Sequence, residues 1–184
     1  RDSDSDGLSN YDEIVVHKTD PNNSDSDEDG FNDGSEIAEG TKPNDDQSVP
    51  TRTLTVVTPL NGSISGGGEF RLDSLVTLPA TPDDGYVFTS WTGDNESSNN
   101  PLTLVMSANR NLSAVFNKDR RDTDEDGLTN YDEIFVHETN PNDADSDEDG
   151  FADGLEINKG TDPNDSQSFP EATVIPLRIQ KTNA

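Results

Sequence analysis

The feature that most constrains this chain is a twelve-residue acidic pattern that occurs four times. Each copy reads Asp-x-Asp-x-Asp-Gly, followed by a glutamate six residues after the glycine, and the copies occupy residues 2–13, 25–36, 122–133 and 145–156. Calcium is a hard cation that takes about six to eight oxygen ligands, and a twelve-residue loop supplies them from positions 1, 3, 5, 7, 9 and 12, with glycine at position 6 for the turn. Each of these positions carries a suitable residue in all four copies, so the pattern predicts about four bound calcium ions.

The predicted ligands are the side chains at positions 1, 3, 5, 9 and 12 and the backbone carbonyl at position 7, with the closing glutamate binding through both oxygens. The full set is Asp2, Asp4, Asp6, Leu8, Asn10, Glu13, Asp25, Asp27, Asp29, Phe31, Asp33, Glu36, Asp122, Asp124, Asp126, Leu128, Asn130, Glu133, Asp145, Asp147, Asp149, Phe151, Asp153 and Glu156. One match alone is compatible with a solvated acidic turn, whereas four complete matches favour metal loops. The sequence leaves open whether flanking residues add further ligands, namely Asp20, Asn22, Asn44, Asp45, Asn140, Asn142, Asn164 and Asp165.

Composition agrees with a chain that relies on bound cations. The 184 residues include only 27% hydrophobic ones and carry a formal net charge of -27, which a single well-filled globule does not tolerate. The same charge disfavours nucleic acid and anionic membranes as partners, because both require basic patches. There is no cysteine, so disulfides, thiol catalysis and cysteine zinc sites are excluded.

The chain contains no run near the roughly 18 apolar residues of a membrane-spanning helix, so membrane insertion is not expected. It opens inside the first acidic loop, at Arg1-Asp2. We therefore expect it to be part of a longer protein whose neighbouring domains are its partners.

An internal duplication organises the sequence. Residues 2–48 align without gaps with residues 122–168, and 33 of the 47 aligned positions are identical. This predicts an elongated arrangement of three modules: a first paired-loop module over 1–48, a β domain over 53–117 and a second paired-loop module over 122–168. Residues 169–184 are then a linker or the start of a further domain, with a candidate strand at Val174 to Ile179.

Each paired-loop module is too short for two EF-hands. The loops of a pair start 23 residues apart, and an EF-hand needs a helix on both sides of its loop. Asn10 to Val16 can form about two helical turns before Pro21, and the second helix is expected to end at Gly40. The plausible packing residues of the first copy are few, and such a core would hardly fold without the ion. They are Leu8, Tyr11, Ile14, Val16, Phe31 and Ile37.

The middle segment is predicted to be all β. Strand-like runs span Leu54 to Thr58, Leu75 to Ala80, Tyr86 to Trp91, Leu102 to Met106 and Asn111 to Phe116, and turn-forming residues separate them. Alternation predicts two inward-facing sets: Leu102, Leu104 and Met106, then Leu112, Ala114 and Phe116. Trp91, the only tryptophan, is expected to be a core residue, with sugar stacking as its alternative role.

The run DSDSDGLSNYDEIVVHKTDPNNSDSDEDGFNDGSEIAEGTKPND resembles the bacterial form of the thrombospondin type 3 repeat. This resemblance implies backbone wrapped around a row of calcium ions with little regular structure. Animal members carry cysteines, which this chain lacks. Dockerins are the competing resemblance, but they need longer amphipathic helices than Pro21 and Pro43 allow.

The middle segment, with VTLPATPDDGYVFTSWTGD and NPLTLVMSANRNLSAVF, is similar to the divergent InlB B-repeat family of bacterial surface proteins. This implies a compact β-grasp-like spacer or adhesive unit without catalytic residues, in a secreted or surface-attached protein. We therefore expect a mainly β chain with irregular calcium loops and short helices, acting as a non-enzymatic calcium-stabilised spacer. The alternative is an adhesive or carbohydrate-binding module, with a polysaccharide or surface ligand as partner of the β domain.

Overall fold

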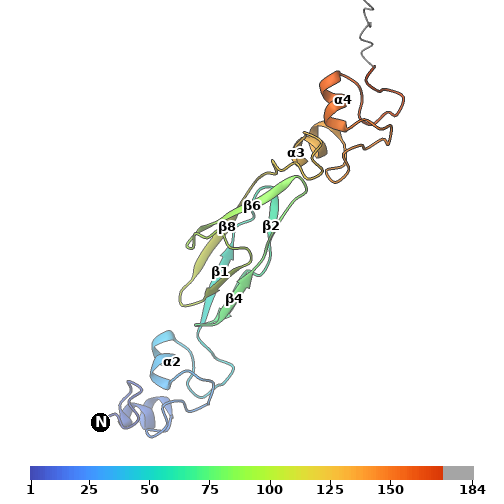
Figure 1. Cartoon of the computed structure of the whole chain (residues 1–184). Coiled ribbons are helices and arrows are strands. Elements are labelled where there is room, and N and C mark those ends of the chain that lie inside the picture. Colours follow the sequence, from blue (N-terminus) through green and yellow to red (C-terminus); the bar gives the residue numbers. More distant parts are fainter. Residues whose placement is uncertain (172–184) are drawn as a thin grey trace, which may run out of the picture. The chain divides into compact units, whose positions relative to one another are not determined.

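The computed structural model describes residues 1–171, so the candidate strand at Val174 to Ile179 lies outside the described residues. Contacts divide the chain into two compact units. One comprises residues 1–81 and 88–116, and the other comprises residues 82–87 and the chain from residue 117 onward. Regular structure consists of eight strands and a few short helical segments, which confirms the prediction of a mainly β chain (Figure 1).

A short helical segment begins at position 9 of each acidic loop. In the first copy they are α1 (Asn10–Asp12), which continues into the π-helical turn η1 (Glu13–His17), and α2 (Asp33–Glu39). In the second copy they are α3 (Asn130–Asp132), η2 (Glu133–His137) and α4 (Asp153–Lys159). Lys18 ends η1 in the left-handed conformation, and Gly40 ends α2 in the same conformation at φ +85°. The predicted end of this helix at Gly40 is confirmed.

Within residues 1–171, all strands lie in the middle segment. They are β1 (Thr51–Val56), β2 (Gly62–Ile64), β3 (Gly68–Arg71), β4 (Leu75–Leu78), β5 (Ala80–Pro82), β6 (Tyr86–Gly93), β7 (Leu102–Val105) and β8 (Arg110–Lys118). A four-stranded sheet has the order β3-β1-β8-β6, and β2-β5 and β4-β7 form two-stranded sheets. Strand β1 is antiparallel to β3, with Thr51 opposite Arg71, and parallel to β8, with Leu54 opposite Arg110.

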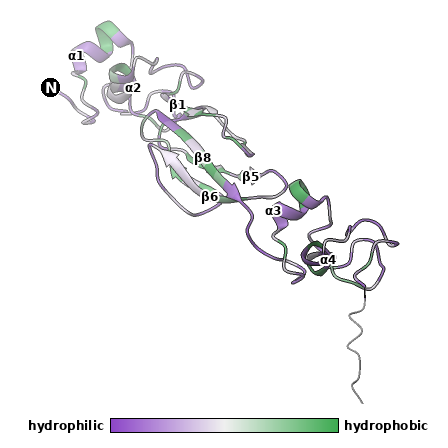
Figure 2. Ribbon diagram, turned by 90° about the horizontal axis from the view of Figure 1, so that it is seen from above, coloured by the Kyte–Doolittle hydropathy of each residue, from purple (hydrophilic) through white to green (hydrophobic). Residues whose placement is uncertain are grey.

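The hydrophobic core sits within these strands. Both predicted inward sets are buried, and Met106 and Leu112 are fully inaccessible. Trp91 is 1% exposed and donates its indole N–H to the Asn99 carbonyl at 2.9 Å, so the core role predicted for it is confirmed. Figure 2 shows hydrophobic and hydrophilic residues alternating along β8, as expected for a strand with one buried face.

The paired-loop segments have no comparable core. Among residues 1–171, every buried aliphatic or aromatic side chain apart from proline lies between Leu54 and Phe116. Leu8, Phe31 and Ile37 are half-buried. The prediction that Tyr11, Ile14 and Val16 also pack inside the first module is wrong, because all three are more than half exposed. The interior of each module is filled by carboxylates instead.

Truncating the β core should destabilise the middle segment strongly. Leu112→Ala removes a fully buried side chain and is expected to cost about 2–5 kcal/mol of unfolding free energy, because a cavity remains. Val105→Ala, at a position 46% exposed in the same segment, is the matched control and should cost much less. Urea unfolding followed by Trp91 fluorescence measures both, and equal losses would contradict this assignment of the core.

Candidate metal centre

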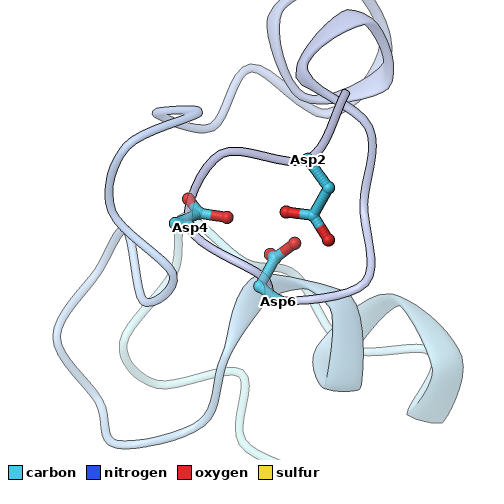
Figure 3. A group of neighbouring side chains, drawn as sticks. All are labelled: Asp2, Asp4 and Asp6. Atoms are coloured by element: carbon cyan, nitrogen blue, oxygen red, sulfur yellow. The ribbon is translucent and has the colours of Figure 1, made fainter.

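The first three aspartates of every acidic loop point toward one another. Figure 3 shows Asp2, Asp4 and Asp6 converging inside the curve of the first loop. In each of the four loops, one carboxylate oxygen from each such aspartate lies within 4.8 Å of the others. Twelve of the predicted ligands are thereby brought together: Asp2, Asp4, Asp6; Asp25, Asp27, Asp29; Asp122, Asp124, Asp126; and Asp145, Asp147, Asp149.

Local hydrogen bonds explain why these loops curve in the same way. The first aspartate accepts from the N–H of the glycine five residues later, at 2.9 Å from Gly30 to Asp25 and at 2.8 Å from Gly150 to Asp145. All four glycines have φ between +95° and +103°, a conformation that glycine adopts readily and other residues resist. The predicted turn at position 6 is therefore present in every loop.

The closing glutamates of the four loops are fully buried. Glu13, Glu36, Glu133 and Glu156 are all 0% exposed. Neither carboxylate oxygen of Glu13 or Glu133 has a hydrogen-bond partner. In Glu36 and Glu156, one oxygen accepts from a threonine hydroxyl, at 3.0 Å and 3.1 Å, and the other has no partner. A buried carboxylate without a partner is costly unless a cation neutralises it, so these oxygens fit a metal ion.

The burial of these glutamates changes their acidity. It raises the pKa of both Glu36 and Glu133 to about 7, and neighbouring aspartate charges add to the effect. Burial also raises the pKa of Glu13, with contributions from Asp4 and Asp6. The potential metal ligands in these clusters are carboxylate oxygens. Such a ligand set suits hard cations such as Ca²⁺ rather than Zn²⁺ or Cu²⁺.

The two loops of a copy are joined at their centres. Carboxylate oxygens of Asp6, Glu13 and Asp33 lie within 4.8 Å of one another, although Asp33 belongs to the second loop. Asp6 Oδ2 accepts from the Gly34 N–H at 3.1 Å, and Asp126 Oδ2 accepts in the same way from the Gly154 N–H at 2.9 Å. A side chain at residue 34 would collide with the Asp6 carbonyl. Reasoning loop by loop missed this link, for which the repeated Asp-Gly pairs at 33–34 and 153–154 were the available signal.

Other predicted ligands have contacts of their own. The Asn10 amide exchanges hydrogen bonds with the Ser3 hydroxyl, and Asn130 accepts from Thr123. Asp33 accepts from both the N–H and the hydroxyl of Ser26, and Asp153 does the same from Ser146. The N–H groups of Leu8, Phe31, Leu128 and Phe151 donate to the aspartates at position 5, at 2.7–2.9 Å. Ligand roles for position 9 and for the carbonyls at position 7 stay predictions.

Among the flanking residues, Asn44 and Asn164 form hydrogen bonds that connect the two loops of their copy. Their side-chain amides donate to the carbonyls of His17 and His137, at 3.0 Å and 2.9 Å. These bonds tie the turn after each second helix to the end of the preceding π-helical turn. They hold the two loops of a copy together.

A basic side chain also reaches the second loop. Arg71, at the end of β3, lies over the Phe31 ring at 4.6 Å, and its Nη2 contacts the Asp29 carbonyl and lies 3.6 Å from Asp29 Oδ1. In the second copy, Phe151 stacks instead on Phe169, with ring centroids 6.3 Å apart. Each phenylalanine at position 7 is therefore covered on one face by a different neighbour.

Comparison with protein families identifies two kinds of repeat in the chain. The model of the bacterial TSP3 repeat, the thrombospondin type 3 repeat, matches residues 2–24, 25–46, 122–144 and 145–166. The model of the divergent InlB B-repeat domain matches residues 52–120. The chain carries bacterial thrombospondin type 3 repeats on both sides of a divergent InlB B-repeat domain. No curated protein and no solved structure matches it significantly.

These families set the broad class of the chain. Both are structural repeat families, found typically in extracellular or surface proteins. Within residues 1–171, no helix has the length and apolar character needed to cross a membrane. The acidic clusters of the TSP3 repeats fit calcium binding.

We expect the metal-free TSP3 repeats to become less ordered as pH rises. Glu36 and Glu133 have a raised pKa of about 7 against an ordinary 4.5, so the stability that their protonation gives is fully present below about pH 4.5 and lost as pH rises through 7. Hydrogen exchange in the presence of a chelator should therefore show more protection of residues 33–39 and 130–137 at pH 5 than at pH 8, after correction for intrinsic exchange rates. Equal protection at both pH values would contradict burial of these carboxylates.

Proposed function

We propose that this chain is a calcium-stabilised structural spacer of a larger secreted or cell-surface bacterial protein. Its modules are residues 1–48, 53–117 and 122–168, and about four calcium ions make the two TSP3 modules rigid. The single observation that carries the proposal is the burial of four glutamates, each with at least one carboxylate oxygen that lacks a hydrogen-bond partner and each acted on by aspartate charges of its own loop.

Calcium does in these modules what apolar side chains do in the β domain. Four ions would reduce the formal charge from -27 to about -19, and most of that neutralisation would fall inside the loops. Without them, carboxylate oxygens of like charge lie within 4.8 Å of one another in every loop. Apolar burial in the modules is too small to offset that repulsion together with the entropy of ordering the chain.

In the proposal, each ion is bound by the three aspartates of its loop and by the closing glutamate. Glu13 and Glu133 would bind through both oxygens, which is supported by the lack of any hydrogen-bond partner for either oxygen. Asp33 lies between the two sites of the first copy, since its charge acts on Glu13 and on Glu36. The ions of a pair are therefore neighbours that share an acidic environment, and binding of one is expected to affect the other.

Calorimetric titration of chelator-treated protein with calcium tests the proposal. We expect about four ions per chain and a gain of ordered structure by circular dichroism. Trp91 fluorescence should stay unchanged throughout, because the β core contains none of the acidic loops. A fully ordered chain that takes up no calcium would overturn the proposal.

One substitution should remove one site. Glu133→Gln keeps the size of the side chain but removes a buried charge, so the titration should lose about one ion, with a smaller weakening at the adjoining loop. Glu125→Gln is the matched control, because Glu125 belongs to the same loop and its side chain is exposed. Loss of calcium binding in both variants would indicate a diffuse charge effect instead of a defined site.

The adhesive alternative lacks its main candidate residue. Trp91 is 1% exposed and packs against Phe88, with ring centroids 5.7 Å apart. It cannot stack on a sugar ring without opening the β core. The spacer function is therefore the one that the residues support best.

A further inference from the structure

The same helical turn is exposed in one TSP3 module and partly covered in the other. Tyr11 is 68% exposed and Ile14 57% exposed, whereas their counterparts Tyr131 and Ile134 are half-buried; Phe135, the counterpart of Val15, is 52% exposed. Figure 2 shows hydrophobic colour beside both the α1 and the α3 labels. We call Tyr11, Ile14 and Val15 the Tyr11 face. It is an apolar surface on an otherwise acidic module, and its duplicate in the same chain has a partner.

That partner is the turn that precedes and begins β6. The Tyr86 ring meets Tyr131 edge-on, with centroids 5.5 Å apart and planes at 82°, and lies 5.9 Å from the Phe135 ring. Lys118 Nζ lies 3.8 Å from the centroid of the Tyr131 ring. All of these residues belong to one compact unit. The contact combines aromatic packing with a cation over a ring, both of which are favourable at partly exposed sites.

The backbone of this turn is shaped for the contact. Gly85 has φ +73°, and a Cβ at this residue would lie 2.5 Å from Cε2 of Phe135. The Gly85 carbonyl accepts from the Asp119 N–H at 2.8 Å, and the Asp119 carbonyl accepts from the Tyr131 N–H at 3.1 Å. The sequence Asp83-Asp84-Gly85-Tyr86 therefore supplies a close backbone approach followed at once by an aromatic ring.

Hydrogen bonds to the buried Asp119 complete the covered face. Asp119 is buried, accepts from Arg121 at 2.9 Å and 2.6 Å, and accepts from the Asn130 amide at 3.0 Å. The first module has arginine and asparagine at the matching places, Arg1 and Asn10. The first module therefore has the two residues that correspond to the donors to Asp119, although its Asn10 amide donates to the Ser3 hydroxyl at 2.8 Å.

We propose that the Tyr11 face is a docking surface for a second β domain of the divergent InlB B-repeat type. That domain presents an Asp-Asp-Gly-Tyr turn to Tyr11 and Val15, and the Lys-Asp pair at the end of its last strand reaches Tyr11 and Arg1. The β domain at residues 52–120 is not the occupant, because its own turn is taken by Tyr131 and Phe135. The exposed face and the covered face are two copies of one interface.

The test places such a domain where the duplication predicts it. A second copy of residues 51–120 is joined directly ahead of Arg1, which reproduces the junction between residues 120 and 121. Hydrogen exchange of residues 10–17 is then compared in the original and the extended chain, and the comparison does not depend on which ion fills the loops. We expect protection of residues 10–17 to rise in the extended chain toward that of residues 130–137. Unchanged exchange of residues 10–17 would overturn the proposal.

Matched variants separate docking from a general gain in order. In the original chain, Tyr131→Ala should speed exchange of residues 130–137 roughly two- to tenfold, the range that one aromatic pair gives, and Tyr11→Ala should leave residues 10–17 unchanged. In the extended chain Tyr11→Ala should acquire the effect of Tyr131→Ala, and Gly85→Ala in the added copy should abolish the new protection. Equal effects of Tyr11→Ala in both chains would contradict docking. Sedimentation that shows the original chain dimerising through the Tyr11 face would replace the proposed occupant with a second copy of the chain.

Discussion

Carboxylates occupy the interior of the TSP3 modules, and the need to neutralise them is the constraint on which the rest of the structure depends. Glu13, Glu36, Glu133 and Glu156 are fully buried, while the apolar side chains around them are half-buried or exposed. This is why we propose that a cation takes the place of a hydrophobic core when such a module folds. The left-handed glycines and the aspartate side chains that accept backbone N–H groups shape the loops around that requirement.

The chain consequently has two sources of stability. The InlB-type segment buries Leu54, Trp91, Met106 and other apolar residues within its sheets. The TSP3 modules bury charge instead. Under the proposed function, their order depends on the calcium around the protein, and millimolar calcium, as in extracellular fluids, suits even weak sites of this kind. The proposed spacer would then be stiff where calcium is present and lose the order of its TSP3 modules where calcium is withdrawn.

Sequence reasoning predicted best what depends on local pattern. The turn glycines, the aspartate clusters and the inward residues of β7 and β8 follow from fixed spacing, and the structure places them as expected. Strands β2 and β3 were not predicted, because they begin at Gly62 and Gly68, and glycine favours turns. The packing assigned to Tyr11 and Ile14 was wrong, since periodicity assumes an apolar interior and these modules have an acidic one.

The contacts between the two loops of a copy could not be predicted from the sequence, for a related reason. Whether Asp33 of one loop meets Asp6 and Glu13 of another depends on how two short irregular segments fold against each other, and no periodic pattern encodes that. The hydrogen bond from Gly34 to Asp6, repeated from Gly154 to Asp126, shows that the pairing is a property of the module. The duplication makes this evident, because the same hydrogen bond occurs in both copies of the module.

The most direct test of the central claim is a crystal structure of the calcium-soaked protein with anomalous diffraction data that locate calcium. The account predicts about four anomalous peaks, each about 2.3–2.6 Å from the oxygens of one closing glutamate and its aspartates. A map without peaks at Glu13, Glu36, Glu133 and Glu156, with these carboxylates hydrogen-bonded to protein or water, would contradict it.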